Sequence, residues 1–341
     1  MLESNIALYI GAPIEDVSER VVLCSLLAIL RERAVPVAVF ANLNIGGRQL
    51  DFVIGTEQLT LVIETKGTSY PLRGRYNGDW AALTRTGRWK PYRNAYLQAL
   101  QAKNVLRDAM RAHDDSLSGY PNASVMFTPY LPTDSDLPAS DYKVSLNDLG
   151  ELAALIDQVS MLRWNPDRWH HFAEAHSLQR LTDVKSAFDT RLLDAEKSLN
   201  RYTSAFAATY EPMVARYVPD TYHLDGKASE LSDIETELVR ERADLLIRGP
   251  SGCGKTLLSL CLANRIIASG IVPIVVDCKS FDGQLATSLD REATLLDMQS
   301  AAALIAATRR MSRPIAVFVD GYNECQEATR VQLARALRAA L

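Results

Sequence analysis

Hydrophobic and polar positions follow two different periods in the first 130 residues. Residues 15–32 carry apolar side chains at helical spacing, which predicts a helix. Three apolar runs follow between residues 35 and 66, separated by Gly-rich or polar turns, and these predict strands. A second helical pattern covers 94–113, and residues 122–132 predict a further strand. The expected order is helix, three strands, helix, strand.

The pattern becomes helical and polar after about residue 147. Apolar residues spaced three and four apart run from Val184 to Phe206, like the seam of a coiled coil. On base rates, a helix that packs within its own domain is favoured over one that joins chains. From about residue 243, predicted strands and helices alternate, which is typical of a parallel α/β sheet. We therefore expect three parts: residues 1–146, a helical linker over 147–226, and residues 227–341.

Charged side chains interrupt two of the predicted strands. If the hairpin loop runs from Thr56 to Leu59, antiparallel partners have residue numbers that sum to 115, which places Asp51 opposite Glu64. Side chains alternate along a strand, so Lys66 shares the face of Glu64. The other face is expected to form a buried core of Leu50, Phe52, Ile54, Leu61 and Ile63.

The pairing of Asp51 with Glu64 has a chemical consequence. Two neighbouring carboxylates repel each other, and each pKa rises unless a cation lies between them. Mg²⁺ suits such a pair because it prefers oxygen ligands and keeps positions for water and a phosphate. Lys66 could then orient or deprotonate an attacking water, or stabilise the charge that develops on phosphorus. The alternative is a buried ion pair that has only a structural role.

An acid followed by Glu-x-Lys, on this order of elements, resembles the PD-(D/E)xK nucleases, and more closely their NERD branch, the nuclease-related domain. The resemblance covers about residues 10–135. It rests on a Glu in the first helix, an Asp strand, a Glu-x-Lys strand and an Asn-x-x-x-Gln helix start, matched by Glu19, Asp51, Glu64 with Lys66, and Asn94 with Gln98. The resemblance implies an αβββαβ fold and metal-dependent hydrolysis of DNA.

The same resemblance implies a role for each residue of the site. Asp51 and Glu64 would hold Mg²⁺, and Lys66 would serve the attacking water. Glu19 would assist at the metal, and Gln98 would help to position the substrate or the water. These five residues are the predicted catalytic set.

The sequence between Lys66 and the second helix is basic. Residues 66–93 hold seven Lys or Arg and one acid, Asp79, a local charge of +6 (seven minus one) in a chain of net charge −4. Tyr and Trp residues are interleaved, so the cations could neutralise backbone phosphates while the rings stack or wedge against bases. The alternative is a solvated basic hairpin with a small aromatic cluster. The expected DNA contacts are Arg73, Arg75, Arg85, Arg88, Lys90 and Arg93, and the rings are Tyr70, Tyr76, Trp80, Trp89 and Tyr92.

A second motif, GPSGCGKT, fits the phosphate-binding pattern G-x-x-x-x-G-K-[ST]. It follows an apolar run at 243–249, a predicted strand, and precedes a helical pattern. Glycines in such a loop let backbone N–H groups face phosphates at the start of the helix. Lys255 would reach the β- and γ-phosphates of ATP, and Thr256 would coordinate its Mg²⁺. The loop glycines are Gly249, Gly252 and Gly254.

The apolar run that ends at Asp320 supplies the expected partner strand, with Asp320 holding Mg²⁺. Its tail, DGYNE, resembles the Asp-Gly-x-Asp-Glu end of this strand in NACHT-type STAND NTPases. Asn323 stands where that family commonly has an acid, so either Glu324 polarises the water or nucleotide binding alone is the switch. Only 341 − 249 = 92 residues follow the first loop glycine. We expect a truncated NTPase module and an N-terminal portion of a longer protein.

Composition and the N-terminal sequence indicate the expected cellular location of the protein. The five cysteines form no CxxC pair and lie near no His at metal-ligand spacing, which is typical of reduced thiols in a cytoplasmic protein. The first 20 residues lack the pattern of a signal peptide. No apolar run approaches the roughly 20 residues of a membrane span, so no membrane partner is expected.

Together the two resemblances imply a DNA nuclease effector joined to a nucleotide-driven switch, as in bacterial antiphage defence. A sensor beyond residue 341 would recognise a foreign phage molecule, and ATP-bound chains would assemble into a homo-oligomer that activates the nuclease. One alternative is an ATP-driven repair or restriction nuclease, although we find no helicase motif. Another is a catalytically silent, nucleotide-gated scaffold, against which the complete set of Asp51, Glu64 and Lys66 counts.

Overall fold

The chain divides into two compact units, Met1–Thr190 and Arg191–Leu341. This computed structural model describes residues 3, 5–33, 35–84, 86–218, 222–224, 226–241, 244–250 and 252–340. None of the helices among these residues is both long and apolar enough to cross a membrane.

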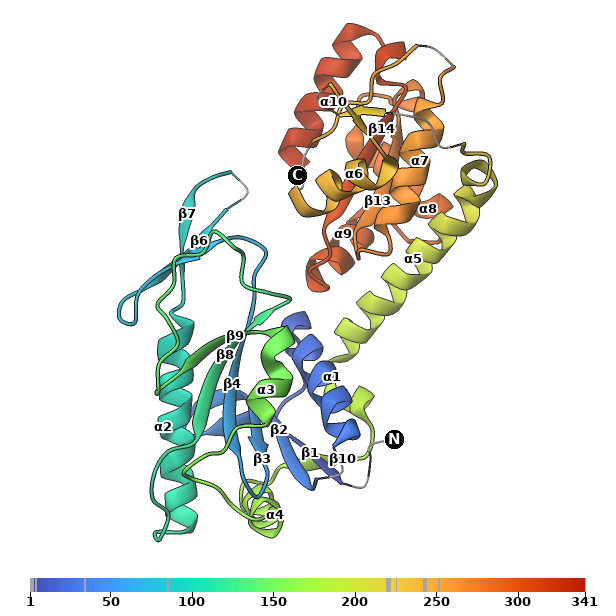
Figure 1. The fold of residues 1–341 in the computed structure, drawn as a ribbon. Coiled ribbons are helices and arrows are strands. Elements are labelled where there is room, and N and C mark those ends of the chain that lie inside the picture. Colours follow the sequence, from blue (N-terminus) through green and yellow to red (C-terminus); the bar gives the residue numbers. More distant parts are fainter. Residues whose placement is uncertain are drawn as a thin grey trace. The chain divides into compact units, whose positions relative to one another are not determined.

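One mixed sheet of seven strands forms the first unit (Figure 1). In spatial order its strands are β10 (Gln179–Leu181), β1 (Ile6–Ile10), β2 (Val37–Ile45), β3 (Arg48–Gly55), β4 (Thr60–Gly67), β8 (Asn122–Thr128) and β9 (Ser145–Asp148). β2, β3 and β4 pair antiparallel, whereas β1 runs parallel to β2, and β4, β8 and β9 run parallel to one another. β10 closes one edge, antiparallel to β1.

Helices flank both faces of this sheet. α2 (Ala95–His113) and α4 (Pro166–Ala175) share a core with Phe40, Val53 and Val62. α1 (Val17–Glu32) contacts β4 and β8 from the other side and also contacts α3 (Leu152–Ile156) (Figure 1). The predicted order of helix, three strands, helix and strand is confirmed by α1, β2 to β4, α2 and β8. β1, β9 and β10 are additions that the sequence analysis did not predict.

A smaller antiparallel sheet lies between β4 and α2 in the chain. It comprises β5 (Leu72–Arg73), β6 (Trp80–Leu83) and β7 (Trp89–Tyr92). Figure 1 shows the β6–β7 hairpin extending beyond the end of the large sheet. We call residues 68–93, which include this sheet, the basic arm.

The expected alternation fails at one point in the large sheet. Leu50 was predicted to share a face with Phe52, but it packs in the core that contains Leu43 and Val53. Asn42 in the neighbouring strand has a φ of 49°, in the left-handed region. A residue with this backbone interrupts the regular pleat, so side chains on either side of it change faces.

The second unit combines helices with short strands. Its parallel pair is β13 (Val272–Asp277) and β14 (Ile315–Asp320), and β11 (Tyr222–Leu224) pairs antiparallel with β12 (Lys227–Ser229). The helices are α5 (Thr190–Val214), α6 (Leu231–Thr236), α7 (Lys255–Ile266), α8 (Leu285–Leu295), α9 (Ala301–Arg310) and α10 (Glu327–Ala340).

Most of the apolar positions predicted as a coiled-coil-like seam are buried inside this unit. This is the packing expected for a helix that contacts its own domain. The buried residues of the seam in α5 are Leu192, Ala195, Leu199, Tyr202 and Phe206. The Tyr202 hydroxyl donates a hydrogen bond to the Pro273 carbonyl at 2.9 Å. The helix begins later than expected, because Val184 lies in a short 3₁₀ turn and Phe188 precedes α5.

The predicted strand over 243–249 is wrong within the described residues 244–250, which form no strand. Leu245 and Ile247 instead pack against the cluster of Ile234, Leu258 and Leu262. Alternating burial is present, but strand assignment also needs a ladder of backbone hydrogen bonds to a neighbour.

The expected linker, 147–226, is shared between the two units. Its first part supplies β9, β10 and α4 to the large sheet and core, and its second part supplies α5 to the second unit. The three-part division with boundaries at 146 and 226 stays a prediction.

We expect Leu199→Ala to lower the free energy of unfolding by about 2–4 kcal/mol, because it leaves a cavity at a fully buried position. The exposed Lys197 in the same helix provides a control, and Lys197→Ala is expected to change stability by less than about 0.5 kcal/mol. Chemical denaturation and sedimentation of both variants make the measurement. A change in oligomeric state without a loss of stability would instead assign the seam to contacts between chains.

Candidate active site

The hairpin of β3 and β4 brings Asp51 beside Glu64. Phe52 pairs with Ile63 and Val53 with Val62, so the predicted register is confirmed. The Thr56 N–H donates to the Leu59 carbonyl at 2.8 Å and closes the loop.

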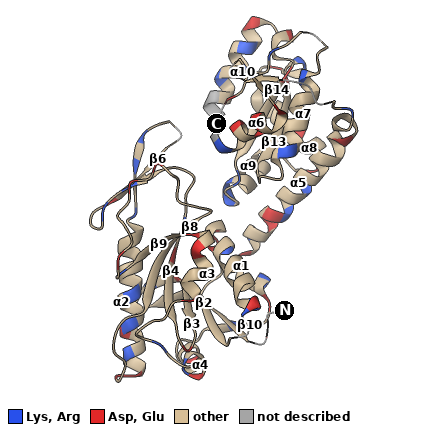
Figure 2. Ribbon diagram, viewed as in Figure 1, with Lys and Arg blue, Asp and Glu red and all other residues tan. Residues whose placement is uncertain are grey.

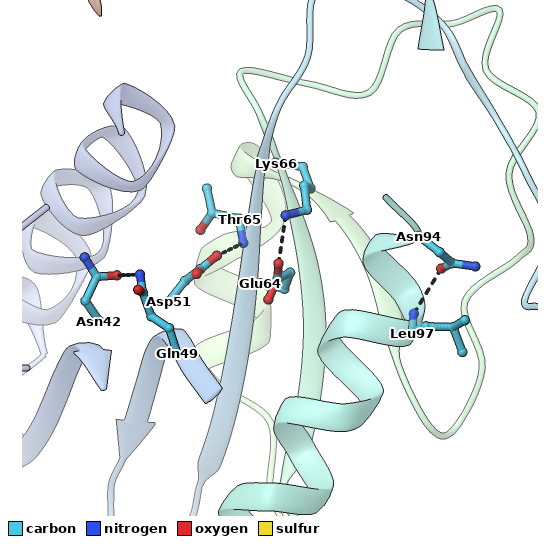
Figure 3. Close-up of polar contacts among 8 residues, drawn as sticks. All are labelled: Asn42, Gln49, Asp51, Glu64, Thr65, Lys66, Asn94 and Leu97. Atoms are coloured by element: carbon cyan, nitrogen blue, oxygen red, sulfur yellow. Dashed lines mark hydrogen bonds and ion pairs between the residues drawn. The ribbon is translucent and has the colours of Figure 1, made fainter. Parts of the chain in front are cut away.

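The ladder between these strands ends just before Asp51. There the Asp51 carboxylate, rather than a backbone carbonyl, accepts the hydrogen bond of the Thr65 N–H at 2.8 Å (Figure 3). Asp51 therefore occupies the place of a ladder partner, with its charge directed at the end of β4.

Lys66 and Glu64 form a close ion pair on β4. The Lys66 ammonium donates to Glu64 Oε1 at 2.7 Å, and their side chains are 17% and 7% exposed. Burial lowers the pKa of Lys66, but the charges of Glu64 and Asp51 more than offset this and leave that pKa raised. Lys66 is therefore protonated at neutral pH. A cationic Lys66 can stabilise negative charge but cannot accept a proton, which narrows its possible roles.

The acids of the site are strongly perturbed. Burial, followed by the charge of Glu64, raises the pKa of Asp51 to about 7. Burial, followed by the charge of Asp51, raises the pKa of Glu19 to about 8, although a hydrogen bond from Asn42 opposes this shift. Both acids thus carry a cost of ionisation that a nearby cation would relieve.

The first turn of α1 delivers Glu19 to this site. The Asp16 carboxylate caps the helix by accepting the Ser18 N–H at 2.7 Å. Ser18 also lies against Gly67, where an added Cβ would come within 2.0 Å of the Ser18 hydroxyl. A glycine directly after Lys66 therefore allows α1 to approach the end of β4.

The donor set fits a hard divalent cation. Asp51 and Glu64 offer carboxylate oxygens, which are the ligands that Mg²⁺ prefers. In the described part of the chain, no group of three or more His, Cys, Asp or Glu side chains could hold a metal. Asp51 and Glu64 alone would suffice, because Mg²⁺ usually keeps several waters and binds through one or two carboxylates.

Asn94 proves to be a structural residue. Its side-chain oxygen caps α2 by accepting the Leu97 N–H at 3.0 Å, and its amide donates to the carbonyls of Arg75, Tyr76 and Gly78 at 3.1, 3.2 and 2.7 Å. One side chain therefore joins the start of α2 to the base of the basic arm.

Gln98 lies one turn further along α2. Its Oε1 is buried and accepts no hydrogen bond from the described residues. An amide oxygen in that state is expected to take a donor such as water or substrate. The positioning role of Gln98 stays a prediction.

Most of the described cations of the basic arm are exposed. Figure 2 marks the Lys and Arg positions along the ribbon. Arg73 stacks over the Trp89 ring at 4.3 Å, and Arg75 pairs with Asp136 at 3.0 Å. The exposed residues of the predicted DNA contacts are Arg73, Arg75, Arg88, Lys90 and Arg93, whereas Arg85 lies outside the described residues.

The prediction for Trp80 was wrong. This ring is 1% exposed and belongs to the core, and its N–H donates to the Arg75 carbonyl at 3.0 Å. Gly74 lies against the ring, where a Cβ would approach within 2.1 Å. Trp80 anchors the arm and is not available to stack on bases.

A comparison with known protein families found a match that lies in the first unit. Residues 17–128 match NERD, the nuclease-related domain. The match runs from the start of α1 to the end of β8 and contains the Asp51–Glu64–Lys66 cluster. A NERD domain suggests nuclease activity. No curated protein and no solved structure matches the chain.

Two residues near the NERD site, Asn42 and Gln49, escaped the sequence analysis. Tyr92 was predicted only as a ring that could stack on bases, whereas it is half-buried and interacts electrostatically with Lys66. Gln49 donates to Asn42 at 2.9 Å beside Asp51. The one signal for Asn42 was that it is one of two Asn residues in a mostly apolar strand, VAVFANLNI.

The second unit contains the residues of the predicted phosphate-binding loop. Gly252 and Gly254 have φ values of 77° and 86°, which are readily available only to glycine, and α7 begins at Lys255. The Lys255 ammonium donates to the carbonyls of Gly249 and Pro250 at 3.0 and 2.7 Å. It therefore folds back on its own loop.

Thr256 and Asp320 lie together, as two ligands of one ion must. The Thr256 hydroxyl donates to the Asp320 carboxylate, with distances of 2.9 and 3.0 Å to its two oxygens. Glu324 pairs with Lys279 at 2.7 Å, and both side chains are at least half exposed. Such a surface pair is weak, so Glu324 is free to change partners. The NACHT resemblance of this unit stays a prediction.

The pKa of Asp51 generates a test of the NERD site. A carboxyl whose folded pKa is about 7, against 3.8 in its ordinary state, stabilises the fold at low pH, and this stability is lost as pH rises through 7. In metal-free protein we expect Asp51→Asn to be more stable than the wild type at pH 8, by on the order of 2 kcal/mol, and to lose less stability between about pH 5.5 and pH 8. Thermal denaturation in a chelator measures both slopes.

The matched control is Asp115→Asn, which makes the same change at an exposed carboxylate. Its stability should depend on pH as the wild type's does. Identical slopes for all three proteins would show that Asp51 is not strained by burial.

Proposed function

We propose that this chain is a metal-dependent DNA nuclease whose activity is controlled by a nucleotide-binding module. The observation that supports the nuclease best is the buried cluster of Asp51, Glu64 and Lys66 at the end of the β3–β4 ladder, inside the NERD match. The perturbed acids, the cation that shares their site and the adjoining basic arm all favour phosphodiester hydrolysis.

The residues divide the chemistry as follows. Asp51 and Glu64 would hold Mg²⁺, which when bound would polarise the phosphate and lower the pKa of water. Lys66 is protonated, so it would donate to the phosphate oxygens as negative charge develops there. Gln98 would accept a hydrogen bond from the attacking water or the substrate through its free Oε1. Glu19 would add negative charge beside Asp51.

The basic arm would bind the DNA backbone. Its exposed cations neutralise phosphates without reading sequence, so affinity should fall steeply with salt. Stacking on Trp89 holds the Arg73 guanidinium in place, and the hydrogen bonds of Asn94 fix the base of the arm at the start of α2. This arrangement supports DNA as the substrate class.

The second unit would bind ATP with Mg²⁺. Lys255 would exchange the two carbonyls of its own loop for the β- and γ-phosphates, and Thr256 with Asp320 would hold the metal. As in the STAND proteins that it resembles, ATP would drive assembly of several chains after a foreign phage molecule is sensed. Assembly raises the effective concentration of the nuclease on DNA, which keeps single chains harmless.

A second candidate is a catalytically silent scaffold gated by nucleotide. The tight pair of Lys66 and Glu64 favours it, since a purely structural ion pair would have the same geometry. The two functions differ in whether DNA is cut.

We expect Lys66→Ala to reduce Mg²⁺-dependent nicking of plasmid DNA at least about 100-fold, because it removes the charge that stabilises the transition state. Lys185→Ala, at an exposed position outside the NERD match, should cut like the wild type. Gel assays with ATP present follow the conversion to nicked circles. Equal nicking by Lys66→Ala and wild type would remove Lys66 from catalysis, and an inert wild type would favour the scaffold.

We expect Lys255→Ala to weaken binding of a fluorescent ATP analogue at least about 100-fold and to abolish the effect of ATP on DNA cleavage. The control is Lys227→Ala, an exposed lysine of the same unit. Thermal denaturation would show that the NERD domain remains folded. Cleavage that is the same for mutant and wild type, with or without ATP, would contradict the coupling.

A further inference from the structure

The loop that follows β8 begins at the catalytic end of the large sheet. β8 runs parallel to β4, and Thr128 pairs with Gly67, the residue directly after Lys66. Residues 129–144, which we call the β8–β9 loop, therefore leave the sheet next to the catalytic strand. The Thr68 N–H donates to the Thr128 carbonyl at 3.2 Å and keeps the two segments together beyond the last ladder pair.

Hydrogen bonds attach the β8–β9 loop to the basic arm. The Asp136 N–H donates to the Leu72 carbonyl at 2.8 Å, and the Gly74 N–H donates to the Asp136 carbonyl at 2.9 Å. The Tyr76 hydroxyl donates to the Ala139 carbonyl at 2.8 Å. The loop thus lies along β5, and arm and loop form one surface that begins at the end of β4.

Charge is divided unevenly over this surface. The arm carries the exposed cations, whereas the β8–β9 loop holds three Asp and one Lys, a charge of −2 (one minus three). Two of these acids are engaged within the domain. Asp136 pairs with Arg75 at 3.0 Å, and Asp141 accepts the Tyr96 hydroxyl at 2.7 Å. Phosphates would therefore bind on the arm, and a contact between the loop and nucleic acid would be made by uncharged groups.

One uncharged side chain of the loop is placed for such a contact. Tyr130, the second residue of the loop, is 60% exposed, and its ring packs against no other ring among the described residues. By contrast, Arg73 covers the Trp89 ring, and the Tyr76 ring packs against Tyr96 with centroids 4.9 Å apart. Tyr130 therefore offers a ring face on which a base could stack, at the catalytic end of the sheet.

We propose that the nuclease site acts on single-stranded DNA, and that Tyr130 stacks on a base next to the phosphate that faces Lys66. The bases of a duplex are paired and stacked inside the helix, so a ring beside the cut phosphate reaches a base face only where that base is unpaired. In a single strand, a base can turn away from the backbone while the arm holds the neighbouring phosphates. The inference rests on the proposed nuclease function.

Three substitutions test the ring. Tyr130→Ala removes it, and Tyr130→Phe keeps the ring without its hydroxyl. The control is Tyr120→Ala, which removes a tyrosine that is 48% exposed and lies before β8, at the opposite end of that strand. Because both tyrosines are exposed, all three variants should melt close to the wild type.

Binding is measured by fluorescence anisotropy of the full chain in a chelator, so that DNA is not cut, with a labelled single strand and with the duplex of the same sequence. We expect Tyr130→Ala to weaken binding of the single strand about 10-fold and of the duplex less than about 2-fold, whereas Tyr130→Phe and Tyr120→Ala bind like the wild type. The dependence of affinity on salt should not change in Tyr130→Ala, because no cation is removed. With Mg²⁺ and ATP, the wild type should cut a single-stranded circle at least about 10-fold faster than a relaxed duplex circle.

No loss of binding in Tyr130→Ala, or an equal loss for both DNAs, would overturn the stacking role of Tyr130. A relaxed duplex that is cut as fast as the single strand would overturn the preference for single strands and leave the nuclease proposal intact. Failure of the wild type to cut either DNA would overturn the nuclease proposal and this inference with it.

Discussion

The buried carboxylate of Asp51, next to a second acid where the β3–β4 ladder ends, is the constraint around which the first unit is organised. Its charge raises the pKa of Glu19 and helps to keep Lys66 protonated. The Thr65 N–H and the Lys66 charge offset only part of the cost of burying it, since the pKa of Asp51 remains raised. Placing these acids together costs folding free energy. Their placement is therefore better explained by a role in binding or catalysis than by a contribution to the stability of the fold.

Support for this cluster comes from residues that carry no charge. Gly67 admits the first turn of α1, Asn42 distorts β2 opposite Asp51, and Asn94 joins α2 to the arm. Each acts by setting where a backbone segment can lie. The positions of the charged groups therefore depend on close packing, and small changes in volume far from the reacting atoms would be felt at the site.

The sequence was sufficient for the parts of this site that follow local rules. The hairpin register followed from one assumed loop and from alternation along the strands, and the motif order identified the NERD region. Leu50 was misplaced because alternation fails across Asn42, whose backbone conformation no pattern of apolar residues reveals. Trp80 was misread because exposure depends on tertiary contacts. The run at 244–250 had strand-like residues, but pairing depends on a neighbour that the local sequence does not specify.

The burial of Trp80 has a consequence for dissecting the protein. The base of the arm is part of the hydrophobic core and is tied to the start of α2. The proposed DNA-binding surface and the folded core therefore share residues there. Among the described residues of the tip between β6 and β7, Thr84 and residues 86–88 are not part of that core. Deletion mutants that shorten the hairpin at its tip can separate an effect on binding from an effect on folding. Removal of the whole arm would instead expose the interior of the domain.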